Sequence, residues 1–223
     1  MISSSSATVL PTDDMPASKR NFVDASLAKY FGCKKENGNL ERCLDDQIQQ
    51  YLDSTRAEIL DDAKDQADTD LVDQSYRFEY YENNDVSIRY DEDDILLLEE
   101  NTSQYTGGAH GMYGTSLQVL DLANNKVLKL SDVTTADSAT LEHLLEKAFR
   151  KDYNLKKTDS LSNLLFEDYL AANDNFYITR KGLGFLYNPY EVASFAAGII
   201  EVFIPFKEMK GKLAPWFVKR MGL

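Results

Sequence analysis

The apolar residues of this chain change their spacing near residue 60, and this change limits the possible folds more than any other feature. From Leu40 to Ile59 they recur at steps of three and four, with Asn39 in front of them as a candidate N-cap. That spacing predicts a long amphipathic helix, whose other face is acidic. From Tyr76 onward apolar and polar residues alternate instead, which predicts strands. A chain of this kind buries its core between a helix and a sheet.

The alternating segment predicts an antiparallel sheet that follows the helix. In order it contains strands at 76–80 and 86–90 around an Asn-Asn-Asp turn at 83–85, then a turn at 91–94 and a strand from Ile95 toward Tyr105. Short turns of this composition join antiparallel neighbours. We expect the long helix to pack on this sheet.

The second half of the chain repeats this plan with different details. Strands are predicted at 112–122, 127–130, 176–179, 183–187 and 200–206, with tight turns at 124–125 and 180–182, an amphipathic helix through 141–149 and a helical segment near 161–169. Helices and strands occur in mixed order, without regular βαβ alternation. The fold class is therefore α+β, with mixed, largely antiparallel sheets packed by the long N-terminal helix and the second helix.

Negative charge is concentrated in one part of the chain. The formal net charge is -13, and residues 41–100 contain 20 Asp and Glu against 5 Lys and Arg. Such a field repels phosphate backbones, so nucleic acid is not an expected ligand, and it speeds encounters with a basic protein. The alternative is that these residues only keep the surface solvated.

The chain has two cysteines, Cys33 and Cys43. A disulfide between them would close a short loop, would contribute roughly 2 to 3 kcal/mol and would require an oxidising compartment. Without further ligands the two thiols do not make a zinc site. Cys43 could instead be a buried residue of the helix, and both readings stay open.

The sequence contains no membrane span and no complete targeting signal. Its most apolar stretch, 192–206, is broken by Gly198, Glu201 and Pro205. Met1 and Ile2 are followed by four serines, without the basic and apolar regions of a signal peptide. Either the protein is cytoplasmic or the sequence is a mature or trimmed form.

The first conspicuous motif is Tyr-Thr-Gly-Gly-Ala-His-Gly at 105–111. His110 could act as a catalytic base or a metal ligand, but neither it nor His143 occurs in a metal-binding spacing. The glycines do not match a phosphate-binding pattern either. We therefore expect a bulged entry to a strand, with a histidine hydrogen-bonded to the backbone, and no metal or other cofactor.

The second motif is Asn-Pro-Tyr-Glu at 188–191. Asn188 can serve as N-cap, Pro189 suits the first helical position, and Glu191 can reach back to the N–H of the cap. The pattern predicts a short helical turn that ends at Gly198.

The residues in and around these motifs could serve catalysis or binding. Glu191 and Glu201 could form a carboxylate pair for glycosidic chemistry, although ten residues separate them. No G-x-S-x-G elbow supports a serine hydrolase. The aromatic residues could form a recognition surface, although half of them must face the core by strand alternation: Phe185, Tyr187, Tyr190 and Phe195.

Both motifs belong to a set that resembles a known family. The set also includes Leu-Lys-Leu-Ser-Asp at 128–132, Phe-Tyr-Ile-Thr-Arg-Lys-Gly-Leu-Gly-Phe at 176–185, Ala-Gly at 197–198 and Glu-Val-Phe-Ile-Pro at 201–205. Together these segments resemble the C-terminal domain shared by the extracytoplasmic part of the anti-sigma factor RsiV and the non-catalytic region of the peptidoglycan deacetylase PdaC. The resemblance covers 105–213, and the upstream helix and hairpin resemble the smaller α/β domain that often precedes it.

The resemblance implies an irregular or strand-like lead-in at 1–20, a small α/β domain at 21–104 and an RsiV-like α+β domain at 105–223. It also implies an exported protein of the cell envelope, periplasmic or an outer-surface lipoprotein, whose signal sequence and possible lipid anchor lie outside this sequence. In RsiV the bound partner is lysozyme, a basic protein. The chain contains no membrane span, no cytoplasmic sigma-binding segment and no deacetylase domain, so neither RsiV signalling nor PdaC activity carries over.

We therefore expect a non-catalytic binding domain that recognises a basic protein such as a lysozyme-like hydrolase, or a cell-wall glycan. The candidate binding residues are Tyr105, Gly107, Gly108, His110, Tyr187, Asn188, Pro189, Tyr190 and Glu191. One alternative is an enzyme acting on wall polymers through His110 with Glu191 or Glu201. Another is a scaffold domain whose exposed aromatic residues form a homo-oligomer.

Overall fold

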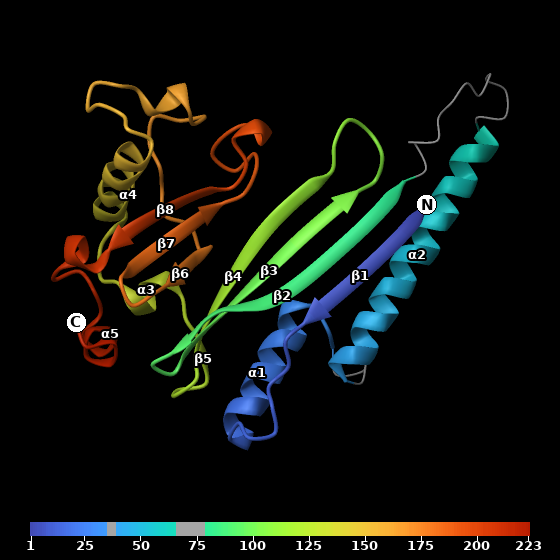
Figure 1. Cartoon of the computed structure of the whole chain (residues 1–223), viewed down its shortest axis with the longest axis horizontal. Coiled ribbons are helices and arrows are strands. Elements are labelled where there is room, and N and C mark those ends of the chain that lie inside the picture. The colour runs from blue at the N-terminus through green and yellow to red at the C-terminus, as the bar shows by residue number, and fades with distance from the viewer. Residues whose placement is uncertain (35–38, 66–78) are drawn as a thin grey trace. The chain divides into compact units, whose positions relative to one another are not determined.

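Helices and two sheets alternate irregularly along the chain, as the sequence predicted for an α+β fold. The computed structural model describes residues 1–34, 39–65 and 79–223 (Figure 1). One sheet has five strands in the order β1-β2-β3-β4-β5, and the other has three in the order β6-β7-β8. The chain divides into a first unit, 1–87 with 100–113, and a second unit, 88–99 with 114–223. The boundaries expected after residues 20 and 104 remain predictions.

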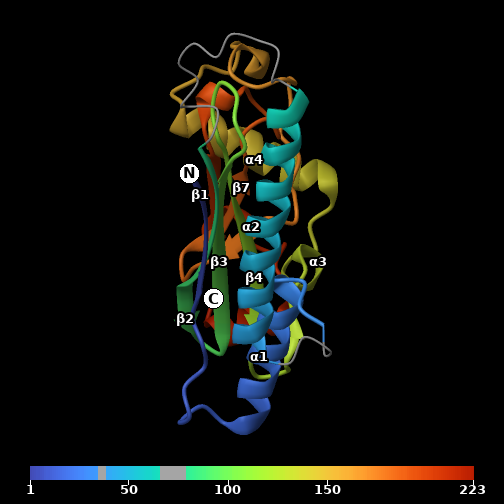
Figure 2. The same cartoon turned by 90° about the vertical axis from the view of Figure 1, so that its right-hand side faces the viewer.

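In the first unit the N-terminal strand lies at the sheet edge. Strand β1 (Ile2–Thr8) pairs in parallel with β2 (Tyr80–Glu92), and Ile2 lies opposite Tyr80. Helix α2 (Leu40–Asp65) runs alongside β1 (Figure 2). The predicted long helix and the strand-like start of the chain are therefore both present.

Helix α2 begins where the sequence predicted. The Asn39 Oδ1 atom accepts a hydrogen bond from the backbone N–H of Arg42 at 2.9 Å, so Asn39 is the N-cap. The outward face is acidic, with exposed side chains at Glu41, Asp45, Asp46, Asp53, Glu58 and Asp61. The amphipathic pattern thus places the apolar stripe inside and the acidic stripe in solvent.

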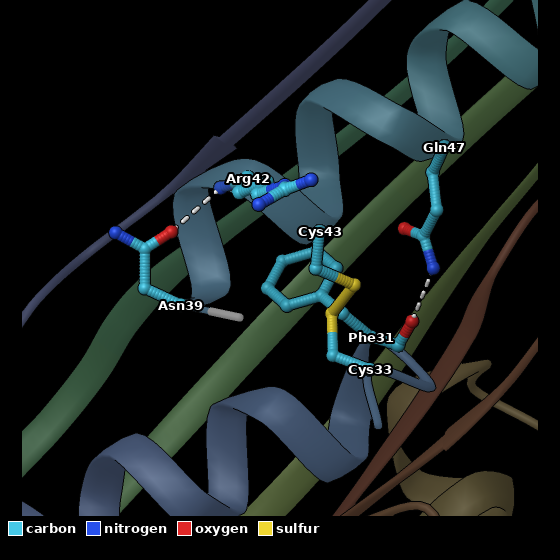
Figure 3. Close-up of a disulfide and its surroundings, with 6 residues drawn as sticks. All are labelled: Phe31, Cys33, Asn39, Arg42, Cys43 and Gln47. Atoms are coloured by element: carbon cyan, nitrogen blue, oxygen red, sulfur yellow. Dashed lines mark hydrogen bonds between the residues drawn. A yellow bond between two sulfur atoms is a disulfide. The ribbon is translucent and has the colours of Figure 1, made fainter. Parts of the chain in front are cut away.

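A disulfide between Cys33 and Cys43 joins α2 to the end of α1 (Ala17–Tyr30) (Figure 3). The Gln47 amide donates a hydrogen bond to the backbone oxygen of Phe31 at 2.8 Å. Cys43 is also buried, so it is both a disulfide partner and a core residue of the helix.

The long strands β2, β3 (Ile95–Tyr105) and β4 (Met112–Asp121) contribute residues to both units. The turn predicted at 83–85 is wrong, because β2 passes through it without a break. The Asn83 amide donates to the Ser103 hydroxyl at 3.3 Å, and the Asn84 amide donates to Glu100 at 2.7 Å. The predicted strand residues Tyr76 and Phe78 lie outside the described ranges.

The turn between β2 and β3 occurs later, at Asp93 and Asp94. Both have the left-handed backbone conformation, with φ of 58° and 57°. Aspartate is among the few residues that adopt this conformation readily, as two-residue hairpin turns require. The turn expected at 91–94 is therefore confirmed in its second half.

The second sheet is antiparallel and consists of β6 (Phe176–Ile178), β7 (Gly182–Tyr187) and β8 (Ile200–Pro205). Helix α4 (Ser138–Asp152) packs against β8 and buries Leu141, Leu145 and Phe149. This arrangement confirms the second amphipathic helix and the three C-terminal strands. The core of the second unit lies between this helix and this sheet.

Two predicted elements are shorter or different in the structure. Strand β5 is only Lys126–Val127, and Leu130 begins a short helix, α3 (Leu130–Val133), rather than ending a strand. The helical segment near 161–169 is a single 3-10 turn at Leu161–Asn163. The Asp168 carboxylate accepts hydrogen bonds there from the N–H of Leu161 and the hydroxyl of Ser160, which favours a closed loop over a helix.

The C-terminal helix α5 (Pro215–Met221) is anchored by an ion pair. Arg220 Nη1 lies 2.8 Å from Asp121 Oδ1, and the Asp121 side chain is 3% exposed. Burial of the Asp121 carboxyl opposes its ionisation, but hydrogen bonds from Arg220 and Asn124 outweigh burial and lower its pKa.

The disulfide provides the first testable prediction. Reduction should lower the free energy of unfolding by roughly 2 to 3 kcal/mol, because an open chain gains entropy in the unfolded state. Urea unfolding with and without reductant measures the change. The Cys33→Ser, Cys43→Ser double variant is the control and should not respond to reductant; an unchanged wild-type midpoint would contradict the prediction.

The Asp121 ion pair predicts acid sensitivity. A carboxyl group with a lowered folded pKa contributes stability above its unfolded pKa, and this contribution is lost as the pH falls through the folded pKa. At pH 7 Asp121→Asn should therefore lower the free energy of unfolding by about 2 kcal/mol. The difference from wild type should shrink below about pH 4. Denaturant unfolding across pH tests this, and a constant difference would contradict it.

Candidate functional site

The glycine-rich motif at 105–111 forms the connection between β3 and β4 in the first unit. Gly107 and Gly108 have φ of 88° and 94°, which glycine adopts without strain. The Tyr105 hydroxyl donates a hydrogen bond to the Gly108 oxygen at 2.8 Å, and its ring stacks on Tyr81. The loop therefore folds back over Tyr105.

His110 bonds the backbone, as the sequence predicted. Its Nδ1 atom lies 2.9 Å from the backbone oxygen of Gly111 and must carry the proton, because a carbonyl oxygen only accepts. Gly111 itself is required by close approach, since a Cβ there would lie 2.8 Å from the Gln104 oxygen. Over the ranges that the structure describes, no three His, Cys, Asp or Glu side chains are grouped to hold a metal ion.

The second motif begins with a buried residue. Tyr187 is 1% exposed, and its hydroxyl donates to the Ala171 oxygen at 2.7 Å. Burial raises the pKa of this phenol. Tyr187 is thus part of the core, and its proposed place on a binding surface is corrected. Strand alternation alone could not reveal this, because both faces of β7 are buried.

Asn188 holds the edge of another strand instead of capping a helix. Its Oδ1 atom accepts the N–H of Thr115 at 2.7 Å, and its Nδ2 atom donates to the Thr115 oxygen at 3.1 Å. The expected helical turn is replaced by a tight turn through Pro189 and Tyr190, closed by the bond from Glu191 N–H to the Asn188 oxygen at 3.0 Å. Tyr190 takes the left-handed conformation, with φ of 68°.

Glu191 behaves as predicted in one respect. Its Oε2 atom accepts the N–H of Asn188 at 2.9 Å, as in the second half of a capping box. Its other oxygen accepts from Asn173 at 2.8 Å. The segment then forms a 3-10 turn, Phe195–Ala197, which ends at Gly198 as expected.

A second asparagine completes the edge of β4, and the sequence contained no signal for it. The Asn175 Oδ1 atom accepts the N–H of Leu117, and its Nδ2 atom donates to the Thr115 oxygen, both at 2.8 Å. Asn175 and Asn188 together therefore do what a neighbouring strand would do for these backbone groups of β4.

Two loops of the second unit, 158–175 and 188–198, carry large exposed apolar side chains, and we call them the acidic–aromatic loops. The exposed fractions are 43% for Leu164, 55% for Phe166, 51% for Tyr169 and 52% for Tyr190. The Phe166 N–H donates to the Val192 oxygen at 2.8 Å and joins the two loops. Their sequence contains Asp159, Glu167, Asp168, Asp174 and Glu191, and no Lys, Arg or His.

These loops are braced by their own hydrogen bonds. Asp168 accepts from the Ser160 hydroxyl at 2.7 Å and from the Leu161 N–H at 2.6 Å, and the Ser160 bond is the main cause of its lowered pKa. The rings of Tyr190 and Phe195 lie 5.7 Å apart. The exposed side chains are therefore presented on shaped loops rather than on open coil.

The carboxylates considered for glycosidic chemistry have different partners. Glu191 bonds Asn188 and Asn173, whereas Glu201 accepts from Arg89 at 3.0 Å and from the Tyr177 hydroxyl. Both carboxylates thus hold the fold together. His110, the third candidate, belongs to the first unit, and the two glutamates belong to the second.

The edge of β4 provides a testable prediction. Asn188→Ala should lower the free energy of unfolding by about 1 to 3 kcal/mol, because the N–H of the buried Thr115 loses the Asn188 acceptor and the Thr115 oxygen loses one of its two amide donors. Asn163→Ala, at an exposed asparagine, is the matched control and should change little. Denaturant unfolding checks both, and equal effects would contradict the role given to Asn188.

Asn188→Asp sharpens this test. The aspartate keeps the acceptor for the Thr115 N–H but turns an oxygen toward the Thr115 carbonyl, which should raise the folded pKa of the new carboxyl. The destabilisation relative to wild type should therefore be largest near neutral pH and should decrease as the carboxyl is protonated. A pH-independent difference would argue against this geometry.

Comparison with family models divides the chain in two. Residues 27–113 match the model described as Deacetylase PdaC, and residues 131–207 match the model described as Protein of unknown function (DUF3298). The likeness to PdaC is thus found upstream, and it includes the glycine-rich motif that our sequence reading placed in the C-terminal domain. No protein of curated function matches the sequence.

Solved structures share the fold. A crystal structure of a DUF3298-family member from Bacteroides fragilis superposes with a TM-score of 0.85 at 23% identity and covers 95% of this chain and 85% of its own. A DUF3298-family protein from Pseudomonas aeruginosa superposes with a TM-score of 0.62 at 19% identity, over 93% of this chain and 83% of its own. In the described part of the chain, no helix has the length and apolar character to cross a membrane. The chain thus joins a segment similar to the PdaC model to one similar to the DUF3298 model, on a fold that solved DUF3298-family proteins share.

Proposed function

We propose that this chain is a non-catalytic binding domain of the bacterial cell envelope, and that it recognises a basic protein through the acidic–aromatic loops. One observation carries the proposal: these loops present four large exposed apolar side chains, and their own sequence contains five acidic residues and no basic one. Exposed tyrosine and phenylalanine on a rigid loop are effective contact residues, because they bury a large area at a small entropy cost.

Charge supports a basic partner. An acidic surface attracts a basic protein over several ångströms and increases the rate of encounter, while the apolar contacts supply most of the affinity. The exposed acidic face of α2 adds to the negative field of the molecule. By the resemblance to RsiV, the partner is a lysozyme-like hydrolase, and a cell-wall glycan is the alternative ligand for the same loops.

The envelope location rests on two supports. A disulfide such as Cys33–Cys43 persists in oxidising compartments and is rare in the cytoplasm. The resemblance to RsiV and PdaC points to the same place. The proposed forms are a periplasmic protein or an outer-surface lipoprotein.

A binding role has more support than an enzymatic one. The candidate catalytic groups His110, Glu191 and Glu201 all make hydrogen bonds that hold their own loops or strands. A homo-oligomeric scaffold would use the same exposed aromatic residues, and a solution mass that rises with protein concentration would favour it.

Titration with lysozyme tests the proposal. We expect saturable binding at low salt that weakens between about 0.05 and about 0.5 M salt. Tyr190→Ser and Phe166→Ser should each lower the affinity about tenfold or more, because each removes a large apolar contact. Ile88→Ser is the control, since Ile88 is 48% exposed but lies on β2 away from these loops in the sequence.

Three results would count against the proposal. Absence of binding at low salt would reject a lysozyme-like partner. Binding that the control weakens as much as the loop variants do would reject the loops as the contact surface. Turnover of wall polymer that is lost in His110→Ala with the fold intact would favour the enzyme.

A further inference from the structure

A shallow cleft in the second unit lies apart from the residues considered so far. It encloses about 590 Å³ and is formed by the end of β2, the β6–β7 turn and Phe203 of β8. Sites for small molecules commonly have volumes of about 300 to 1,000 Å³. The side chains that matter to its chemistry are Arg89, Asp91, Arg180, Lys181 and Phe203.

The aromatic wall of the cleft depends on glycines in β7. Gly184 lies opposite Tyr177 on one side and Phe203 on the other, and a Cβ on Gly184 would overlap the Tyr177 ring. A Cβ on Gly182 would lie 2.7 Å from the Phe203 ring. Glycine weakens a strand interior, so two of them in a buried strand indicate that something must approach the backbone closely. Here the rings of Tyr177 and Phe203 approach the backbone of β7, and they stack with their centroids 6.2 Å apart.

The polar groups of the cleft are held in fixed directions. Arg89 bonds Glu99 at 2.8 Å and Glu201 at 3.0 Å, and its guanidinium lies 4.3 Å from the centre of the Tyr177 ring. Arg180 pairs with Glu92 and Asp93. Fixed donors and acceptors of this kind provide specificity at little entropic cost to the ligand complex.

The charged groups of the cleft are joined in ion pairs. Each of the two arginines is paired with two carboxylates, and Lys181 and Asp91 add one charge of each sign, so these groups together carry a net negative charge. An anionic ligand would be repelled by this excess, and a cationic ligand would have to displace an arginine from its ion pairs. A neutral ligand with many hydroxyl groups could donate to the carboxylates and accept from the guanidinium groups at once, while its C–H face packs on Phe203.

From this geometry we propose that the cleft binds a neutral saccharide, as a second site distinct from the acidic–aromatic loops. Phe203 supplies the apolar face, and Arg180 with Glu92 supplies an oriented donor and acceptor at its rim. Gly182 and Gly184 leave room for the rings of Phe203 and Tyr177 to lie against β7. This inference does not depend on a protein partner for the loops.

Calorimetric titration of the full chain with maltotriose, cellotriose and the neutral N,N′,N″-triacetylchitotriose tests the proposal. We expect saturable binding of at least one of them below about 10 mM, as is typical of weak single-unit sites, and little change with salt. Phe203→Leu keeps an apolar side chain without the ring face, and it should lower the affinity about five- to tenfold. Arg180→Met, at an exposed side chain, should lower it as well without unfolding the protein.

The controls separate the two sites. Tyr190→Ser should leave saccharide binding unchanged, and Phe203→Leu should leave lysozyme binding unchanged. Thermal unfolding of each variant confirms that it is folded. The proposal is overturned if none of the three sugars binds, if binding is lost in Tyr190→Ser and kept in Phe203→Leu, or if charged sugars bind more tightly in a salt-dependent manner.

Discussion

The amide groups of Asn175 and Asn188 satisfy the backbone of β4 where no strand pairs with it. An unpaired strand edge exposes donors and acceptors to other chains, and proteins generally cover or interrupt such edges. Here two side chains do so, and in turn they fix the points where the chain enters β6 and leaves β7. The turn with Tyr190 begins directly at Asn188. The turn that carries the exposed Tyr190 therefore starts from a residue that hydrogen bonds to the buried Thr115 hold in place.

The three-stranded sheet has two faces with different tasks. One face carries Phe185 and Val202 and packs into the core with α4, and the other carries the row of Tyr177, Gly184 and Phe203. Because the middle residue of the row has no side chain, the Tyr177 ring can lie over the strand, where it stacks on Phe203 and lies against the Arg89 guanidinium. The same sheet thus stabilises the fold on one side and forms the wall of a cleft on the other.

Spacing along the chain predicted the elements whose cause is local. The start of α2 at Asn39, the helix α4 and strands β3, β4 and β6–β8 all followed from periodicity and capping residues. The errors occurred where distant partners decide. Asn83 and Asn84 are residue types that favour turns, but their side-chain amides donate hydrogen bonds to β3. Asn188 occurs in a sequence typical of a helix N-cap, but its side chain bonds Thr115, which lies 73 residues away. Of the aromatic residues, sequence could not separate buried Tyr187 from exposed Tyr190, because burial depends on the packing of both sheet faces.

Strand β1 pairs with residues 78 positions further along the chain, and the pairing is parallel, so it cannot begin as a hairpin. It brings together two segments that lie far apart in the sequence. Contacts of this range form slowly, because the entropy of loop closure is lost before the new bonds compensate for it. The residues of β1 are therefore among the last to join the sheet, and until they do, the outer edge of β2 is open to pairing with another chain.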